Sequence, residues 1–320
     1  MVEAARCKGA EQIDQAEATT QIAEKSMKQI TTGGEHVADG GGVRILHPLQ
    51  LNKGPTGEGD GRGQYVGVAI DVETTSLDHR KGKIIELAIR RFRYDGDGII
   101  TDIDEAFQWR EDPGEPLTPE IMALTGLTDI DLVGEEIDED DATRLLNSAS
   151  FVVAHNSGFD RNWVEARLPN ARDLNWCCSM RQVDWRARGF DGRVLGYLLV
   201  QDGYYHAGHR ASADVDALIQ MLRHRDADGR TALSEMIAVG AKASWIIRAK
   251  GADFSVKDAL RARGYRWDSA EGRKVWWREV SDDDLTAERF WLAANVYTVE
   301  ANPKSLGPDV ERVTARERFR

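Results

Sequence analysis

The sequence predicts an α/β protein in which buried strands and helices alternate, followed by a small α+β unit. Two short apolar runs rich in β-branched residues, 66–70 and 149–154, are typical of buried strands. The run 213–223 instead repeats its apolar residues at a helical period. Acidic residues stand at the ends of these elements, and they carry most of the functional information.

Two acids, Asp71 and Glu73, directly follow the first predicted strand. Side chains two positions apart project to the same side of a strand, so both carboxylates can reach one ion or an adjacent pair of ions. Thr74, Thr75 and Ser76 follow as a polar turn that can approach a substrate. Taken alone, the pair also fits two solvated acids at a strand end.

The second predicted strand leads into the segment HNSGFD at 155–160. Asn156 and Ser157 are suited to cap a helix that begins near Gly158, which places Asp160 in the first helical turn. An Asp there also interacts favourably with the helix dipole without any chemistry. The segment therefore needs the other two motifs to indicate a function.

The third motif joins a histidine to an acid at the start of the predicted helix 213–223. His209 lies five positions before Asp214, on the loop that leads into this helix. A loop histidine and a helix-fixed acid suit a base that moves relative to bound cations. Together, the three motifs supply what two-metal phosphodiester hydrolysis requires, namely hard oxygen ligands for two divalent cations and a titratable base for the water.

These motifs resemble the DnaQ-like 3′–5′ exonucleases of the DEDD superfamily, in the subgroup with a catalytic histidine. That family has D-x-E, then H-N-x-x-F-D, then H-x-x-x-x-D, and this chain has them at 71–73, 155–160 and 209–214. Further similarity covers LTPEIMALTGLTD and WCCSMRQVDW, so the resemblance spans about half the chain. His206 is a nearby competitor for the base, but its spacing to Asp214 does not match the third motif.

The resemblance implies an RNase H-like fold, a mixed sheet flanked by helices. It implies that Asp71 bridges two Mg²⁺ or Mn²⁺ ions, and that Glu73 and Asp214 hold the ion that binds the attacking water. Asp160 would then serve the second ion, and His209 would take the proton from the water, since an unperturbed His titrates near pH ~6.5. We expect substrate contacts from residues of the first two motifs: Thr74, Thr75, Asn156 and Phe159.

The expected activity is metal-dependent 3′–5′ hydrolysis of DNA, with release of nucleoside 5′-monophosphates in proofreading, repair or end trimming. The expected partner is single-stranded DNA or a DNA 3′ end. An exoribonuclease is the alternative, because the motifs do not select the sugar. A non-catalytic nucleic-acid-binding adaptor with an exonuclease fold is an alternative of another class, although the complete acid set argues against it.

We expect four parts along the chain: a polar, Gly-rich N-terminal segment (1–62), the exonuclease domain (63–243), a small α+β module (244–300) and a charged tail (301–320). We expect the first part to be disordered or of low complexity, with a short helix within 11–30, and the tail to be mobile. The module's pattern K-x-x-L-x-x-x-G-Y-x-W at 257–267 resembles small units appended to some bacterial exonucleases and other DNA-processing proteins.

The predicted module is rich in tryptophan and arginine. Five of the nine Trp residues lie there, and one functional hypothesis is a surface that stacks single-stranded bases. The alternative, which fits most of these rings, is that a small domain needs large aromatics for its core. Four arginines support a substrate-holding role: Arg261, Arg263, Arg266 and Arg273.

Charge and composition fit a cytoplasmic enzyme without a membrane span. The formal net charge is −12, whereas the last 80 residues hold 16 Lys and Arg against 13 Asp and Glu, a net of +3. No apolar run approaches the ~20 residues of a transmembrane helix, and the N-terminus has no apolar signal core. The three cysteines include the adjacent pair Cys177 and Cys178, which we expect to be buried and free.

Overall fold

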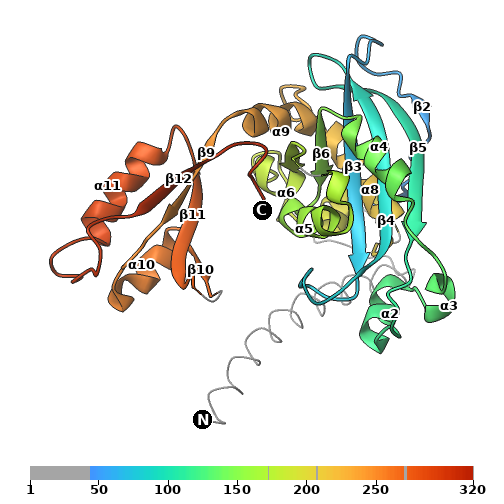
Figure 1. Ribbon diagram of the computed structural model, residues 1–320. Coiled ribbons are helices and arrows are strands. Elements are labelled where there is room, and N and C mark those ends of the chain that lie inside the picture. The colour runs from blue at the N-terminus through green and yellow to red at the C-terminus, as the bar shows by residue number, and fades with distance from the viewer. Residues whose placement is uncertain (1–43, 172, 207, 270–271, 320) are drawn as a thin grey trace. The chain divides into compact units, whose positions relative to one another are not determined.

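A six-stranded mixed sheet forms the centre of the large domain, in the order β2-β5-β4-β3-β6-β7 (Figure 1). The computed structural model describes residues 44–171, 173–206, 208–269 and 272–319. The pairs β2–β5, β5–β4 and β4–β3 are antiparallel, and β3–β6 and β6–β7 are parallel. The strands are β2 Gly54–Pro55, β3 Tyr65–Thr74, β4 Ile84–Tyr94, β5 Ile100–Arg110, β6 Phe151–Ala154 and β7 Trp176–Cys178.

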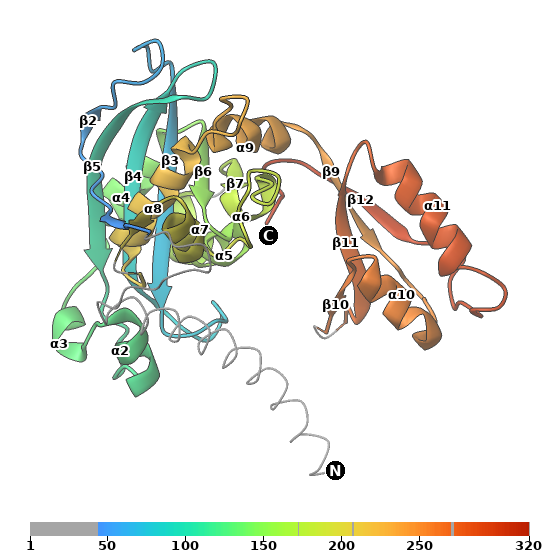
Figure 2. The same cartoon turned by 180° about the vertical axis from the view of Figure 1, so that it is seen from behind.

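Helices cover both faces of this sheet (Figures 1 and 2). Side chains alternate along β3, so Ala69 joins a core with helices α7, α8 and α9, whereas Val68 and Ile70 join a second core with α4 and α5. These helices are α4 Glu139–Asn147, α5 Ser157–Arg167, α7 Leu195–Gln201, α8 Ala211–Arg223 and α9 Ala232–Ala241. The predicted RNase H-like class, a mixed sheet flanked by helices, is confirmed.

Shorter elements connect this framework. β1 and β8 pair in parallel as a separate two-residue ribbon. Cys177 and Cys178 end β7, and both are buried and free, as predicted. The remaining elements of the large domain are β1 His47–Pro48, α2 Pro119–Thr125, α3 Asp129–Leu132, η1 Pro169–Ala171, α6 Ser179–Gln182 and β8 Tyr204–Tyr205.

The C-terminal module, defined here as residues 244–313, is a four-stranded antiparallel sheet with helices packed on it. Its strand order is β10-β11-β9-β12. The predicted helix after Ser255 is capped differently, because the Asp253 side chain accepts from the Ser255 N–H at 2.9 Å. The elements are β9 Ser244–Arg248, η2 Phe254–Val256, α10 Lys257–Ala262, β10 Arg266–Asp268, β11 Val275–Ser281, α11 Leu285–Asn295 and β12 Asp309–Val313.

The large domain begins before the predicted boundary at residue 63. β2 pairs with β5, and the guanidinium of Arg90 donates to the carbonyl of Leu51 at 3.0 Å. Glu58 forms ion pairs with Arg223 and Arg225. These long-range contacts order a stretch whose own composition predicts disorder. Residues 1–43, including the predicted helix within 11–30, lie outside the described residues.

The segment predicted to be a mobile charged tail is also folded. β12 pairs with β9 along its whole length. Arg318 is only 4% exposed, and its guanidinium donates to the carbonyls of Gly240 and Lys242 at 3.1 and 2.7 Å. Phe319 packs in the core beneath α4 and α5. The charge of Arg318 is therefore satisfied by backbone carbonyls and by the carboxylate of Glu279 rather than by water.

None of the helices in the described part of the chain has the length and apolar character that a membrane crossing requires.

Candidate active site

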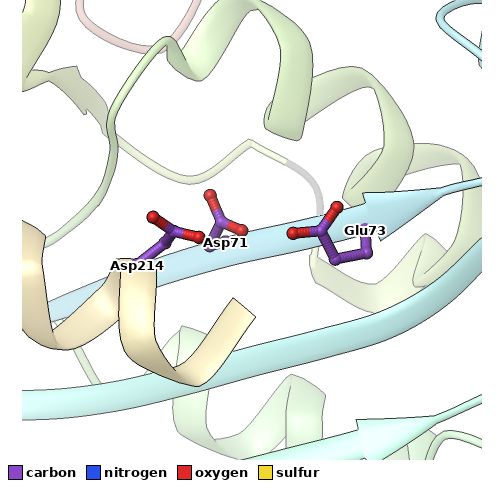
Figure 3. A group of neighbouring side chains, drawn as sticks. All are labelled: Asp71, Glu73 and Asp214. Atoms are coloured by element: carbon purple, nitrogen blue, oxygen red, sulfur yellow. The ribbon is translucent and has the colours of Figure 1, made fainter. Parts of the chain in front are cut away.

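Three carboxylates from two elements meet on one face of the central sheet (Figure 3). Asp71 and Glu73 project from β3, and Asp214 projects from the first turn of α8. One oxygen of each carboxylate lies within 4.8 Å of the others. α8 is held over this face because Val215 and Leu218 are buried in the same core as Ala69 of β3. The residues predicted from the first and third motifs are therefore brought together.

Asp160 approaches the same place from α5. It is 3% exposed and lies in the first turn of that helix, as predicted from the second motif. α5 begins soon after β6, which runs parallel to β3 and stops at Ala154. The backbone of Val72 hydrogen-bonds to Asp160. Among the described residues, however, the group with mutually close oxygens consists of the other three acids.

Crowding of these carboxylates opposes their ionisation. Burial, together with the charges of Asp160 and Asp214, raises the pKa of Asp71 well above its usual range. Burial and the charge of Asp214 raise the pKa of Glu73 to about 8. Burial raises the pKa of Asp160 to about 7. A divalent cation would compensate this charge, and an all-oxygen donor set fits Mg²⁺ or Mn²⁺.

We expect the stability of the cation-free protein to fall as the pH rises. Glu73 has a pKa of about 8 in the folded chain against an ordinary value of 4.5. Its contribution to stability is therefore fully present below about pH 4.5 and is lost as the pH rises through about 8. The melting temperature in EDTA should fall between about pH 4.5 and about pH 8, and Mg²⁺ should raise it most at the upper end. Differential scanning fluorimetry measures both effects.

The matched variant for this experiment is Glu73→Gln, which cannot ionise. Its melting temperature in EDTA should depend less on pH than that of the wild type. An equally steep profile in the variant would show that other groups dominate the pH dependence.

The two candidate histidines occupy different positions around Asp214. The Nε2 atom of His206 lies 2.8 Å from Asp214 Oδ1, and its side chain is only 9% exposed. His209 is exposed, and its backbone N–H donates to Asp214 Oδ2 at 2.9 Å. His209 also has a φ of 61°, in the left-handed region. The structure therefore places the imidazole of His206 on the carboxylate, and His209 on the loop beside it.

His155, the first residue of the second motif, is held by two hydrogen bonds. Its Nε2 lies 2.7 Å from the carbonyl of Arg193, and its Nδ1 lies 2.7 Å from the hydroxyl of Ser179. Because a carbonyl only accepts, Nε2 carries the proton. Burial lowers the pKa of His155 to about 4, so the ring is neutral at neutral pH. The residue ties the second motif to the segment that carries Arg193.

The predicted substrate contacts have structural partners of their own. The hydroxyl of Thr74 donates to the carbonyl of Ser76 at 2.7 Å, and Thr75 Oγ1 accepts from the N–H of Lys83 at 2.9 Å. Both threonines thus stabilise the turn after β3. Asn156 occupies the helix N-cap with a φ of 92°, and its side chain makes no capping hydrogen bond in this described segment, contrary to the prediction.

Phe159, the fourth predicted substrate contact, is partly buried. It packs against the core formed with α4 and α5, with its ring centroid 6.0 Å from that of Trp163. This packing holds the start of α5, where Asp160 lies.

Glu86 is a site residue that the motif search missed. Its side chain is fully buried, and β4 places it opposite Glu73 in the sheet register. Glu86 accepts from the N–H of Ala211 at 2.9 Å and from the Arg210 guanidinium at 3.1 Å, so it holds the N-terminus of α8. The sequence does contain a signal for this role, because Glu86 is the one charged residue within the apolar run IIELAI. Buried carboxylates are rare without a partner, so a charged residue in such a run indicates a specific contact.

Comparison with known proteins finds similarity over the segment that carries the three motifs. Residues 68–222 match the family model RNase_T, described as exonuclease. A segment of 103 residues is 40% identical to a DNA polymerase III PolC-type protein of Halalkalibacterium halodurans, covering 30% of this chain and 6% of that protein. Another of 118 residues is 28% identical to ribonuclease T of Shewanella oneidensis, covering 32% of this chain and 53% of that protein. The chain therefore matches only part of the length of these relatives.

Solved structures show a looser similarity. Exonuclease X in complex with 5′ overhanging duplex DNA has a TM-score of 0.38 and 21% identity, covering 52% of this chain and 99% of that chain. E. coli exonuclease I in complex with a dA16 oligonucleotide has a TM-score of 0.46 and 15% identity, covering 79% of this chain and 64% of that chain.

Proposed function

We propose that this chain is a metal-dependent 3′–5′ exonuclease that releases nucleoside 5′-monophosphates from a DNA 3′ end, in keeping with the match of residues 68–222 to the exonuclease family model. The observation that carries the proposal is the group of Asp71, Glu73 and Asp214, whose oxygens lie within 4.8 Å of one another. Buried Asp160 adds a fourth carboxylate beside them. So many uncompensated carboxylates are costly unless they hold cations.

Each acid has a distinct role in this proposal. Asp71 would contact both cations, Glu73 and Asp214 would hold one of them, and Asp160 would serve the other. When bound, the cations would supply the positive charge that stabilises the attacking and leaving oxygens. His209 would take the proton from the attacking water as the general base.

We propose DNA as the preferred substrate and RNA as the alternative. The higher identity to the PolC-type DNA polymerase segment supports DNA. The similarity to ribonuclease T supports RNA as the alternative. A single strand is a suitable substrate form for both DNA and RNA, because the proposed reaction at the carboxylates requires only the 3′ end of one strand.

The polarity of cleavage tests the proposal directly. With Mg²⁺, a 3′-labelled single strand should release its label at once as a mononucleotide, whereas a 5′-labelled strand should shorten stepwise into a ladder. Matched DNA and RNA oligonucleotides of one sequence compare the two sugars by kcat/KM. Label released first from the 5′ end, or internal cuts, would contradict the polarity. An absence of cleavage with both Mg²⁺ and Mn²⁺ would favour the non-catalytic adaptor.

A further inference from the structure

The sheet of the C-terminal module has one face that its helices leave open. Trp276 packs with Leu260 of α10 and Leu292 of α11 on the covered face. Side chains alternate along a strand, so Trp277 projects to the opposite face. There the strand register places it next to Arg266 of β10. Figures 1 and 2 show both helices on the same side of this sheet.

The open face lines a groove with a volume of about 1150 Å³. The other wall comes from the large domain, where Arg181 of α6 and the loop with Arg193 line it. Basic side chains outnumber acidic ones among the lining residues. Arg318 joins the two walls, because its guanidinium donates to the Gly240 carbonyl of α9 and to the Ser244 hydroxyl of β9.

Three arginines of this groove lie outside its ion pairs, although the charge of Glu279 acts on Arg266. Within the described residues, Arg181, Arg193 and Arg266 form no ion pair with an acidic side chain. The guanidinium of Arg266 lies 6.0 Å from the centroid of the Trp277 ring. Desolvation and the neighbouring charges of Arg181 and Arg193 lower the pKa of Arg266. Positive charge beside an aromatic ring fits a ligand that carries both anionic groups and flat rings.

The other arginines that the sequence suggested for this role are neutralised by acids of the module itself. Arg266 is thus the arginine of that set whose charge is directed to the groove. The paired residues are Arg261 with Asp258, Arg263 with Glu288 and Arg273 with Asp268.

The groove borders the second acid motif. A Cβ atom at Gly158, in the first turn of α5, would lie 3.6 Å from Nη2 of Arg181. The carbonyl of Arg193 accepts a hydrogen bond from His155. The side chain of Arg181 and the backbone of Arg193 therefore lie beside the segment that carries Asp160.

We propose that this groove binds the single-stranded part of the nucleic-acid substrate, with phosphates at Arg181, Arg193 and Arg266 and a base stacked on Trp277. The proposal rests on the proposed function and extends it, since the 3′ end lies at the carboxylates while nucleotides further 5′ lie in the groove. Arginines that neutralise phosphates give salt-dependent affinity, and a stacked ring accepts any base. The groove therefore selects single strands rather than a sequence.

Binding measured in EDTA tests the groove without cleavage. Fluorescence anisotropy with a labelled single strand of about 20 nucleotides, across a salt series, gives the affinity and its salt slope. We expect Trp277→Ala to weaken binding about fivefold or more, the effect of losing one stacked base. Arg266→Glu and Arg181→Gln, on opposite walls, should weaken binding and reduce the salt slope by about one for each lost phosphate contact.

The matched control is Arg289→Glu on α11, an exposed arginine on the helical side of the module. It changes the net charge as Arg266→Glu does, and it should leave the affinity unchanged. Equal losses in this control and in Arg266→Glu would overturn the proposal, as would unchanged affinity and slope in the groove variants. Melting temperatures verify that each variant is folded.

Cleavage of short and long strands separates this proposal from the proposed function. In Mg²⁺, the groove variants should lose far less kcat/KM on a dinucleotide than on the long strand, because a dinucleotide has no nucleotides further 5′ to occupy the groove. Their KM on the long strand should rise. A wild-type protein that binds the long strand through these residues but cleaves nothing would refute the exonuclease proposal and leave the groove standing.

Discussion

Replacing Asp71 with Asn should abolish the nuclease activity, with a loss of roughly 1000-fold or more. The proposed site loses the ligand shared by both cations, and each 1.4 kcal/mol of lost transition-state stabilisation corresponds to about tenfold in rate. The fold should persist, because Asn is isosteric and carries no charge to repel Glu73 and Asp214. The melting temperature in EDTA should therefore equal or exceed that of the wild type. Initial rates on a 3′-labelled strand and thermal unfolding measure the two effects.

Asp140→Asn is the matched control for this variant. Asp140 is an exposed residue in the first turn of α4, outside all three motifs, and its replacement should leave the rate unchanged. EDTA should inhibit the wild type as completely as Asp71→Asn does, and added Mg²⁺ or Mn²⁺ should restore only the wild type. Undiminished cleavage in EDTA would refute the metal-dependent mechanism, whatever the variant shows.

The central strands and the placement of their acids could be predicted because their signals are local. An apolar run followed by D-x-E encodes both a buried strand and two carboxylates on one face, and β3 carries Asp71 and Glu73 in this way. The helix that carries Asp214 could also be predicted, because the apolar residues after Asp214 repeat at a helical period. α8 buries these apolar residues. Such patterns need no knowledge of distant partners.

The domain boundaries depend on distant partners instead, which is why their prediction differed from the structure. β2 has two residues, too few for any period, and it is ordered by pairing with β5. β12 reads DVERV, a charged stretch that becomes a strand because β9 offers it a free edge. Glu86 was missed for a similar reason, since its partners Arg210 and Ala211 lie about 125 positions away.

The folded C-terminus also decides how the module can be tested. Arg161 is fully buried, and its guanidinium donates to the backbone carbonyls of Arg316 and Arg318 at 2.7 and 2.6 Å. A chain that ends at the start of β9 would lack the carbonyls of Arg316 and Arg318 that accept from Arg161. It would also lack Phe319, which packs in the core of the large domain. Loss of activity in such a truncation would therefore report damaged packing. Point variants in the full chain avoid this ambiguity.

His209→Ala should lower kcat by roughly 10²–10⁴-fold, the usual effect of removing a general base. Metal binding should be largely retained, because His209 contacts Asp214 only through its backbone N–H, which Ala preserves. Single-turnover rates over a range of pH measure the effect, and the limb of the profile due to the base should disappear. Additional Mg²⁺ should not restore the rate.

His206→Ala is the informative comparison, because its imidazole and not that of His209 lies against Asp214. A residue that orients a metal ligand acts through the affinity for the metal, so we expect a loss of about tenfold that saturating Mg²⁺ restores. The two histidines thus differ in how their variants respond to metal, as well as in magnitude. If His206→Ala produced the larger loss and Mg²⁺ did not restore it, the base would be His206. In that case the spacing of the third motif would indicate the wrong histidine, and the contact with Asp214 would indicate the general base correctly.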